Sequence, residues 1–159
     1  MPDDWVFPPF VIFGKSKKLG DFVGWVLNVP IVSQRAKDIL KPIVGDAVQF
    51  LRFHEIRGKK YYAMNVLRIE DYLDNERSAG QRNSEGILFT YHRYVFRDLP
   101  DELPPIFKVT PMSEVFVTER IARAIVDNKL TGACLQDPGE SGITLLAQGK
   151  PLNVYPGIL

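Results

Sequence analysis

The sequence predicts an α+β fold in which a largely antiparallel sheet packs against two main amphipathic helices. Two segments repeat apolar residues every three to four positions, as helices with one buried face do. Several short aromatic and β-branched segments, separated by Gly, Pro, Asn and Asp, are typical of strands joined by turns. A chain of 159 residues with 45% apolar and 25% charged residues fits one soluble domain, residues 1–159. A chain of this length needs no disulfide bond or structural metal to hold its fold.

The first clear element is the helix in VSQRAKDILKPIVGD. Before it, residues 5–13 are aromatic but broken by Pro8 and Pro9, which predicts an edge or irregular strand, and residues 14–21 predict a loop. Ser33 is the expected N-cap, and Gly45 is the natural stop. The predicted buried stripe consists of Ala36, Ile39, Leu40, Ile43 and Val44.

A hairpin follows this helix. Residues 48–56 alternate as a strand, with Val48 and Phe50 on one face and Leu51 and Phe53 on the other. The segment RGKK turns the chain back into the strand KYYAMNVL. In IEDYLDN, the spacing of Ile69, Tyr72 and Leu73 predicts one or two helical turns, and SAGQRNSEG predicts a polar loop.

The remaining elements are aromatic strands and a second helix. ILFTYHRYVFR, residues 87–97, predicts a strand or a pair of strands, and the proline-rich residues 98–107 predict a connector that is also a possible lobe boundary near residue 100. Thr118 is the expected N-cap of a helix that ends at Asn128 or Gly132. Short strands are predicted at residues 132–136 and 143–147. The predicted core stripe of the helix is Ile121, Ala122, Ile125 and Val126.

Charge and cysteine content narrow the classes of function. Twenty basic and nineteen acidic residues leave a net charge of +1, so no global field attracts nucleic acid or an anionic membrane. One cysteine, Cys134, makes no intrachain disulfide and no Cys-rich zinc site, which favours a reducing compartment such as the cytoplasm. The N-terminus lacks a signal-peptide pattern, and no segment has the apolar length of a membrane helix.

Four acids, Glu70, Asp71, Asp74 and Glu76, lie close together in the sequence. Clustered carboxylates can hold a hard divalent cation. Here their spacing fits such a site poorly, and no histidine is near them in the sequence. A solvated surface with local pairs, such as Asp74 with Arg77, is the favoured interpretation.

Two other groups of residues leave more than one interpretation open. His54 or His92 would make a nucleophile pair with Cys134 if the fold brought them together, but Cys134 has the small, apolar neighbours of a buried thiol.

FTYHRYVFR mixes aromatic and basic residues, as a base-stacking surface, a structural strand or a protein-binding face would. No known catalytic, nucleotide-binding or metal motif occurs, so the sequence predicts no catalytic residue, cofactor or metal.

Three phrases, in their order, resemble bacterial polymorphic-toxin immunity proteins of family eleven, over about residues 25–136. They are a Val-Ser-x-Arg helix entry, a YY-x-x-NVL strand, and a closing VFV-T-E with an Ala one turn later and L-T-G beyond. The matching residues are Val32, Ser33 and Arg35; Tyr61, Tyr62, Asn65, Val66 and Leu67; and Phe116, Val117, Thr118, Glu119, Ala122, Leu130, Thr131 and Gly132.

The resemblance implies a cytoplasmic antidote, encoded beside a toxin gene, that binds its cognate toxin without catalysis. An uncharacterised enzyme and a nucleic-acid or regulatory binding module are the alternatives. Tyr and Arg dominate binding hot spots, so two aromatic-basic regions are the predicted partner surface. Their residues are Tyr91, Arg93 and Arg97, and Arg57, Lys59 and Lys60 at the hairpin turn.

Overall fold

The computed structural model describes residues 19–26, 29–53, 55–110, 114–139 and 143–148. These residues form two α-helices and three β-sheets, in which all but one of the strand pairs are antiparallel. The predicted α+β class is therefore confirmed. The irregular strand predicted at residues 5–13 and the side chain of His54 lie outside the described residues.

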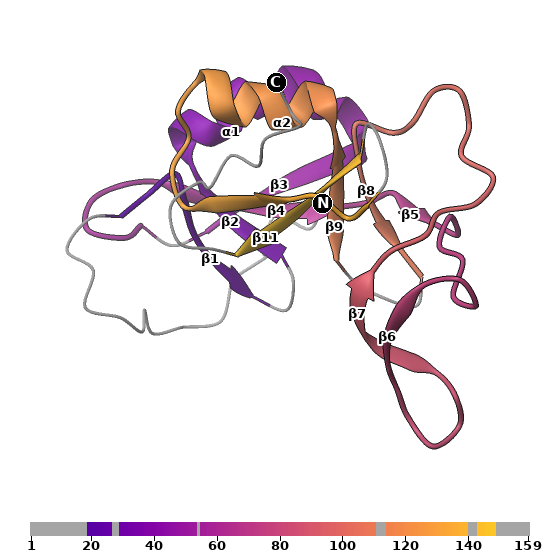
Figure 1. Ribbon diagram of the computed structural model, residues 1–159. Coiled ribbons are helices and arrows are strands. Elements are labelled where there is room, and N and C mark those ends of the chain that lie inside the picture. Colours follow the sequence, from indigo (N-terminus) through magenta and orange to yellow (C-terminus); the bar gives the residue numbers. More distant parts are fainter. Residues whose placement is uncertain (1–18, 27–28, 54, 111–113, 140–142, 149–159) are drawn as a thin grey trace.

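The first sheet belongs to the N-terminal half of the chain (Figure 1). Its strand order is β1-β2-β4-β3, and every neighbouring pair is antiparallel. The predicted hairpin is confirmed as β3 and β4, whereas β1 and β2 were not predicted from the sequence. The elements are β1 (Phe22–Val26), β2 (Val29–Ser33), α1 (Gln34–Val44), the 3-10 turn η1 (Gly45–Ala47), β3 (Val48–Arg52) and β4 (Tyr61–Val66).

The second sheet has the order β10-β11-β9-β8-β5, in which only the short β5–β8 pair is parallel. Its elements are β5 (Ile69–Glu70), β8 (Ile106–Val109), β9 (Val115–Thr118), α2 (Glu119–Asp127), β10 (Ala133–Gln136) and β11 (Ile143–Gln148). Strands β6 (Ala79–Arg82) and β7 (Leu88–Arg93) form a two-stranded sheet of their own that projects from the body (Figure 1). We call this hairpin, residues 79–93, the arm.

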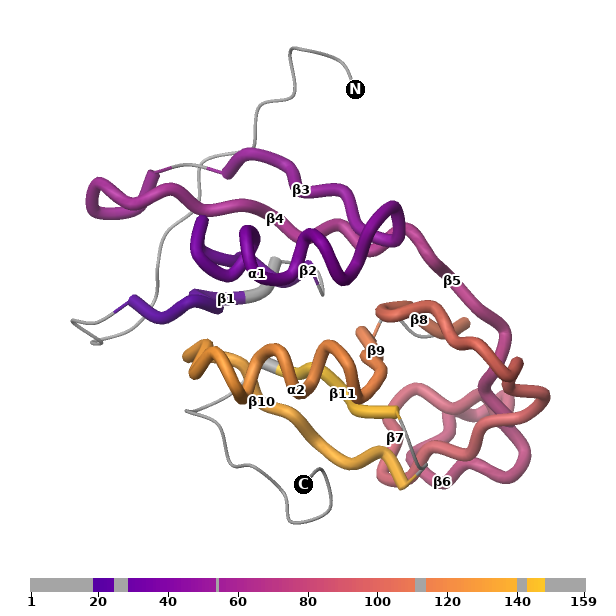
Figure 2. The backbone as a smooth tube through the Cα atoms, turned by 90° about the horizontal axis from the view of Figure 1, so that it is seen from above, coloured from indigo at the N-terminus to yellow at the C-terminus, as the bar shows by residue number. Residues whose placement is uncertain are grey.

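The main core lies beneath the two helices, which run side by side over the sheets (Figure 2). Leu40 and Val44 of α1 and Ile121 and Ile125 of α2 belong to one buried cluster, and Val126 packs against it half-buried. Because both helices and both large sheets contribute to this cluster, the halves share one core. The Ser33 hydroxyl accepts the Ala36 N–H at 3.1 Å, so the predicted N-cap of the first helix is confirmed.

Three local predictions were wrong, wholly or in part. IEDYLDN is not helical, because its backbone pairs with residues 95–97 instead of with itself. The Asp74 N–H donates to the Val95 carbonyl at 2.8 Å, and the Arg97 N–H donates to the Tyr72 carbonyl at 2.7 Å. The predicted polar loop SAGQRNSEG contains β6, and the connector ends where β8 begins at Ile106.

Candidate functional site

The four clustered acids make separate local contacts. Asp71 pairs with Arg97 at 3.1 Å and accepts the Thr110 hydroxyl at 3.4 Å. The Asp74 carboxylate accepts the backbone N–H groups of Glu76 and Arg77 at 3.1 and 3.0 Å, which closes a turn. Asp74 thus bonds the backbone of Arg77 rather than its guanidinium. Across the described part of the chain, no group of three or more His, Cys, Asp or Glu side chains is placed to hold a metal ion.

The residues considered for nucleophilic catalysis lie in different sheets. Cys134 is half-buried on β10, where its Sγ accepts the Gln136 amide at 3.7 Å. His92 is exposed on β7 of the arm. None of the described contacts joins these two side chains.

The arm exposes large apolar side chains near its end. Ile87 and Phe89 are 51% and 55% exposed, while the intervening Leu88 is buried. Arg93 is exposed at the other end of β7, and its guanidinium donates to the Arg77 carbonyl at 3.3 Å. The arm therefore combines apolar and basic groups on a projecting element.

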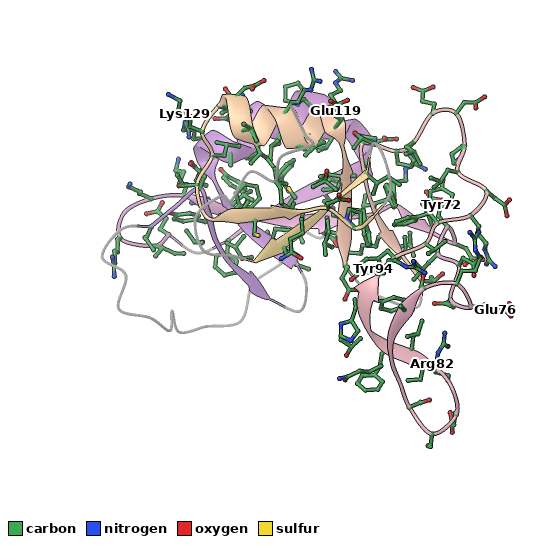
Figure 3. The ribbon with its side chains drawn as sticks, in the orientation of Figure 1. Tyr72, Glu76, Arg82, Tyr94, Glu119 and Lys129 are labelled. Carbon is green, nitrogen blue, oxygen red and sulfur yellow. The ribbon has the colours of Figure 1, made fainter. Side chains whose placement is uncertain are left out.

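Aromatic side chains hold the base of the arm against the second sheet (Figure 3). Tyr91 is half-buried, donates its hydroxyl to Asn75 Oδ1 at 2.6 Å, and stacks on Tyr94 with ring centroids 5.1 Å apart. The rings of Tyr94 and Phe116 make an edge-to-face contact, with their centroids 5.2 Å apart. Burial, with added repulsion from Glu114 and Tyr91, raises the pKa of Tyr94 to about 12. Tyr91 is therefore part of the surface of the arm and also part of the contacts that hold the arm in place.

The second predicted region is the tip of the β3–β4 hairpin, residues 56–60. Ile56 and Lys59 exchange two backbone hydrogen bonds of 2.9 and 3.0 Å. Arg57 and Gly58 between them have φ values of 52° and 73°, as a two-residue type I′ turn requires. Lys59 and Lys60 are exposed. Figures 1 and 2 agree in placing this tip and the arm at opposite ends of the molecule.

Sequence reasoning missed a polar cluster built around Asp21 beside the tip. The Asp21 carboxylate accepts the Ser33 hydroxyl at 2.8 Å, the Arg35 guanidinium at 3.0 Å and the Thr131 N–H at 3.1 Å. Arg35 also donates to the Asn128 carbonyl. The cluster therefore ties the start of α1 to the loop after α2. Three of its members come from the phrases noted above, which were the only signal in the sequence.

A cavity of about 470 Å³ opens beside this cluster. We call it the tip pocket. Tyr61 lies in its wall and donates its hydroxyl to the Gly20 carbonyl at 3.4 Å, and burial together with the Asp21 charge raises the pKa of Tyr61. The lining residues are Leu19, Gly20, Asp21, Ser33, Gln34, Arg35, Gly58, Lys59, Lys60, Tyr61 and Thr131.

Comparison with known families places this chain among immunity proteins. The model of the Immunity protein family (Imm11) matches residues 4–140. The chain therefore belongs to the Imm11 family, which confirms the predicted resemblance. No curated protein sequence matches the chain. None of the helices in the described residues is long and apolar enough to cross a membrane.

Proposed function

We propose that this chain is the cytoplasmic antidote of a cognate toxin, which it neutralises by binding and without catalysis. Membership of an immunity family supports this role. The structural observation that carries it is the arm, a projecting hairpin with two large apolar side chains turned to solvent. Such side chains are anchors for a protein partner when they enter its pockets.

The neutralising surface that we propose includes the arm and its base. Ile87 and Phe89 supply the apolar anchors, and Arg93 supplies a basic group at the other end of β7. Arg97 is half-exposed, and its ion pair with Asp71 orients it at the base of the arm. An exposed pair of this kind contributes little to stability, so Arg97 is free to serve recognition.

The arrangement offers less support to nucleic-acid binding. A basic face for a nucleic acid would need Lys59 and Lys60 beside Arg93 and Arg97, because phosphates follow one another along the strand. The tip, which carries Lys59 and Lys60, and the arm, which carries Arg93, lie at opposite ends of the molecule (Figures 1 and 2).

The test is co-expression with the C-terminal domain encoded by the neighbouring gene, scored for cell survival and co-purification. We expect the wild-type chain to protect the cells. The double variant Ile87→Ala/Phe89→Ala should weaken binding by tenfold or more, on the order of 1.4 kcal/mol, because hot-spot anchors are lost. Alanine at both Arg93 and Arg97 should also weaken co-purification while leaving thermal stability nearly unchanged.

Leu67 and Ile69 provide the matched control, because they are 51% and 61% exposed and lie outside the arm, Leu67 directly after β4 and Ile69 at the start of β5. The variant Leu67→Ala/Ile69→Ala should bind like the wild type. Equal loss in both double variants would show that the arm has no special role. Absence of protection by the wild-type chain would contradict the proposed function itself.

A further inference from the structure

The tip pocket carries positive charge that its own residues do not neutralise. Its lining contains three basic side chains, Arg35, Lys59 and Lys60, against the single carboxylate of Asp21. Arg35 pairs with Asp21 at 3.0 Å. Among the described residues, neither lysine forms an ion pair. Two ammonium groups therefore stand at the pocket without a counter-ion from the described chain.

The pocket holds these lysines on a fixed frame. The Asp21 side chain is only 14% exposed, and its three hydrogen-bonded partners come from two segments far apart in the chain: Ser33 and Arg35 at the β2–α1 junction, and Thr131 after α2. The Gln34 N–H donates to the Lys60 carbonyl at 3.1 Å, which fastens the tip to the start of α1. A binding site whose frame is already ordered loses less conformational entropy when a partner docks.

The two halves of the molecule also differ in charge. Residues 19–66, which include the tip, contain seven basic and four acidic residues, a net charge of +3. Residues 67–148, which include the arm, contain nine basic and thirteen acidic residues, a net charge of −4. A partner that covers the tip meets the basic half, and complementarity favours an acidic surface there.

We infer that the tip pocket receives carboxylate side chains from an acidic segment of the toxin, with Lys59 and Lys60 as their counter-ions. The inference rests on the proposed function and adds a second contact region to it. A volume of about 470 Å³ has room for a few side chains. The arm lies at the opposite end of the molecule from the tip (Figures 1 and 2), so the arm does not continue a track for phosphates from the lysines of the tip.

The test compares two charge-reversal variants by their binding kinetics with the toxin domain encoded by the neighbouring gene. Lys59→Glu/Lys60→Glu alters the pocket. Lys41→Glu/Arg52→Glu makes the same change in net charge on exposed residues of the same half, outside the pocket lining. We expect the pocket variant to bind at least tenfold more weakly, mainly through faster dissociation. The control should change chiefly the association rate, because general attraction acts on encounter.

The outcomes distinguish failure of the inference about the tip pocket from failure of the proposed antidote function. If the wild type binds and protects but both variants lose affinity equally, the pocket has no special role and the inference fails while the function stands. If a single-stranded oligonucleotide displaces the toxin domain from the wild type but not from the pocket variant, the pocket recognises phosphates instead. If the wild type neither binds nor protects, both proposals fail. Unchanged thermal midpoints in both variants verify that they are folded.

Discussion

The β3–β4 hairpin and the β6–β7 arm are both antiparallel, yet they are supported in different ways. Strand β4 lies between β2 and β3 and pairs with both, so the first sheet supports one side of the hairpin. The arm has no third strand in the described structure. The embedded hairpin presents a fixed turn at its tip, whereas the arm presents side chains along its free length.

Side-chain hydrogen bonds replace neighbouring strands in the arm. Arg82 donates to the Gly86 carbonyl at 2.8 Å and to the Asn75 carbonyl at 2.7 Å. The Asn83 side chain accepts the N–H groups of Glu85 and Ile87 at 3.0 and 2.9 Å and so closes the turn. Elements with few buried contacts open locally at low free energy. We therefore expect the arm to open without unfolding the body.

Truncation of one buried side chain in each hairpin gives the largest expected contrast. Met64 of β4 is 1% exposed and belongs to the shared core, so Met64→Ala should cost about 2 to 5 kcal/mol of unfolding free energy. Leu88 of β7 is 4% exposed but belongs to none of the three core clusters. Leu88→Ala should cost on the order of 1 kcal/mol, since the arm relaxes around the change. Denaturant unfolding measures both, and equal losses would show that the arm is as integral as the sheet.

A smaller contrast concerns pH at the base of the arm. In the folded protein the pKa of Tyr94 is about 12, above its ordinary value of 10.0. The neutral phenol therefore contributes its full stabilisation of the fold below pH 10, and this stabilisation is lost as the pH rises toward 12. Between those values the loss should be about 2 kcal/mol. Tyr94→Phe keeps the ring and removes the titration, so its stability should fall less steeply over this range. Chemical denaturation at several alkaline pH values measures the slopes, and parallel slopes for the variant and the wild type would contradict the assignment.

The embedded hairpin could be predicted because its pattern reflects burial on both faces. Val48 and Phe50 pack into the main core, and Leu51 and Phe53 into a separate cluster on the other face, as their alternation predicted. The arm could be predicted only in part. Its strand β6 has the sequence AGQR. Because this strand has no apolar face, it shows no alternation of apolar and polar residues from which a strand could be predicted.

The Asp21 cluster escaped prediction for a different reason. Asp21 stands at the end of a loop-like sequence, and its partners Ser33 and Thr131 are 12 and 110 residues away along the chain. Only the fold brings them together, so local spacing carries no sign of the cluster. The helical turn predicted at IEDYLDN failed for the same kind of reason, because pairing with residues 95–97 overrode its local pattern.

The smallest expected contrast uses the turn glycines of the two hairpins. Gly58 at the tip and Gly86 in the arm have φ values of 73° and 79°, and a Cβ at either position would meet no atom within 4 Å. Alanine therefore adds the same left-handed backbone strain to both turns, about 1 kcal/mol, and no steric clash. Gly58→Ala should lower the global unfolding free energy by about that amount, because the tip unfolds with its sheet. Gly86→Ala should leave the global midpoint nearly unchanged and instead speed hydrogen exchange at the Asn83 and Ile87 amides, because the arm opens by itself. If Gly86→Ala lowers the global midpoint as much as Gly58→Ala does, the arm unfolds only together with the body, and the contrast between the two hairpins is lost.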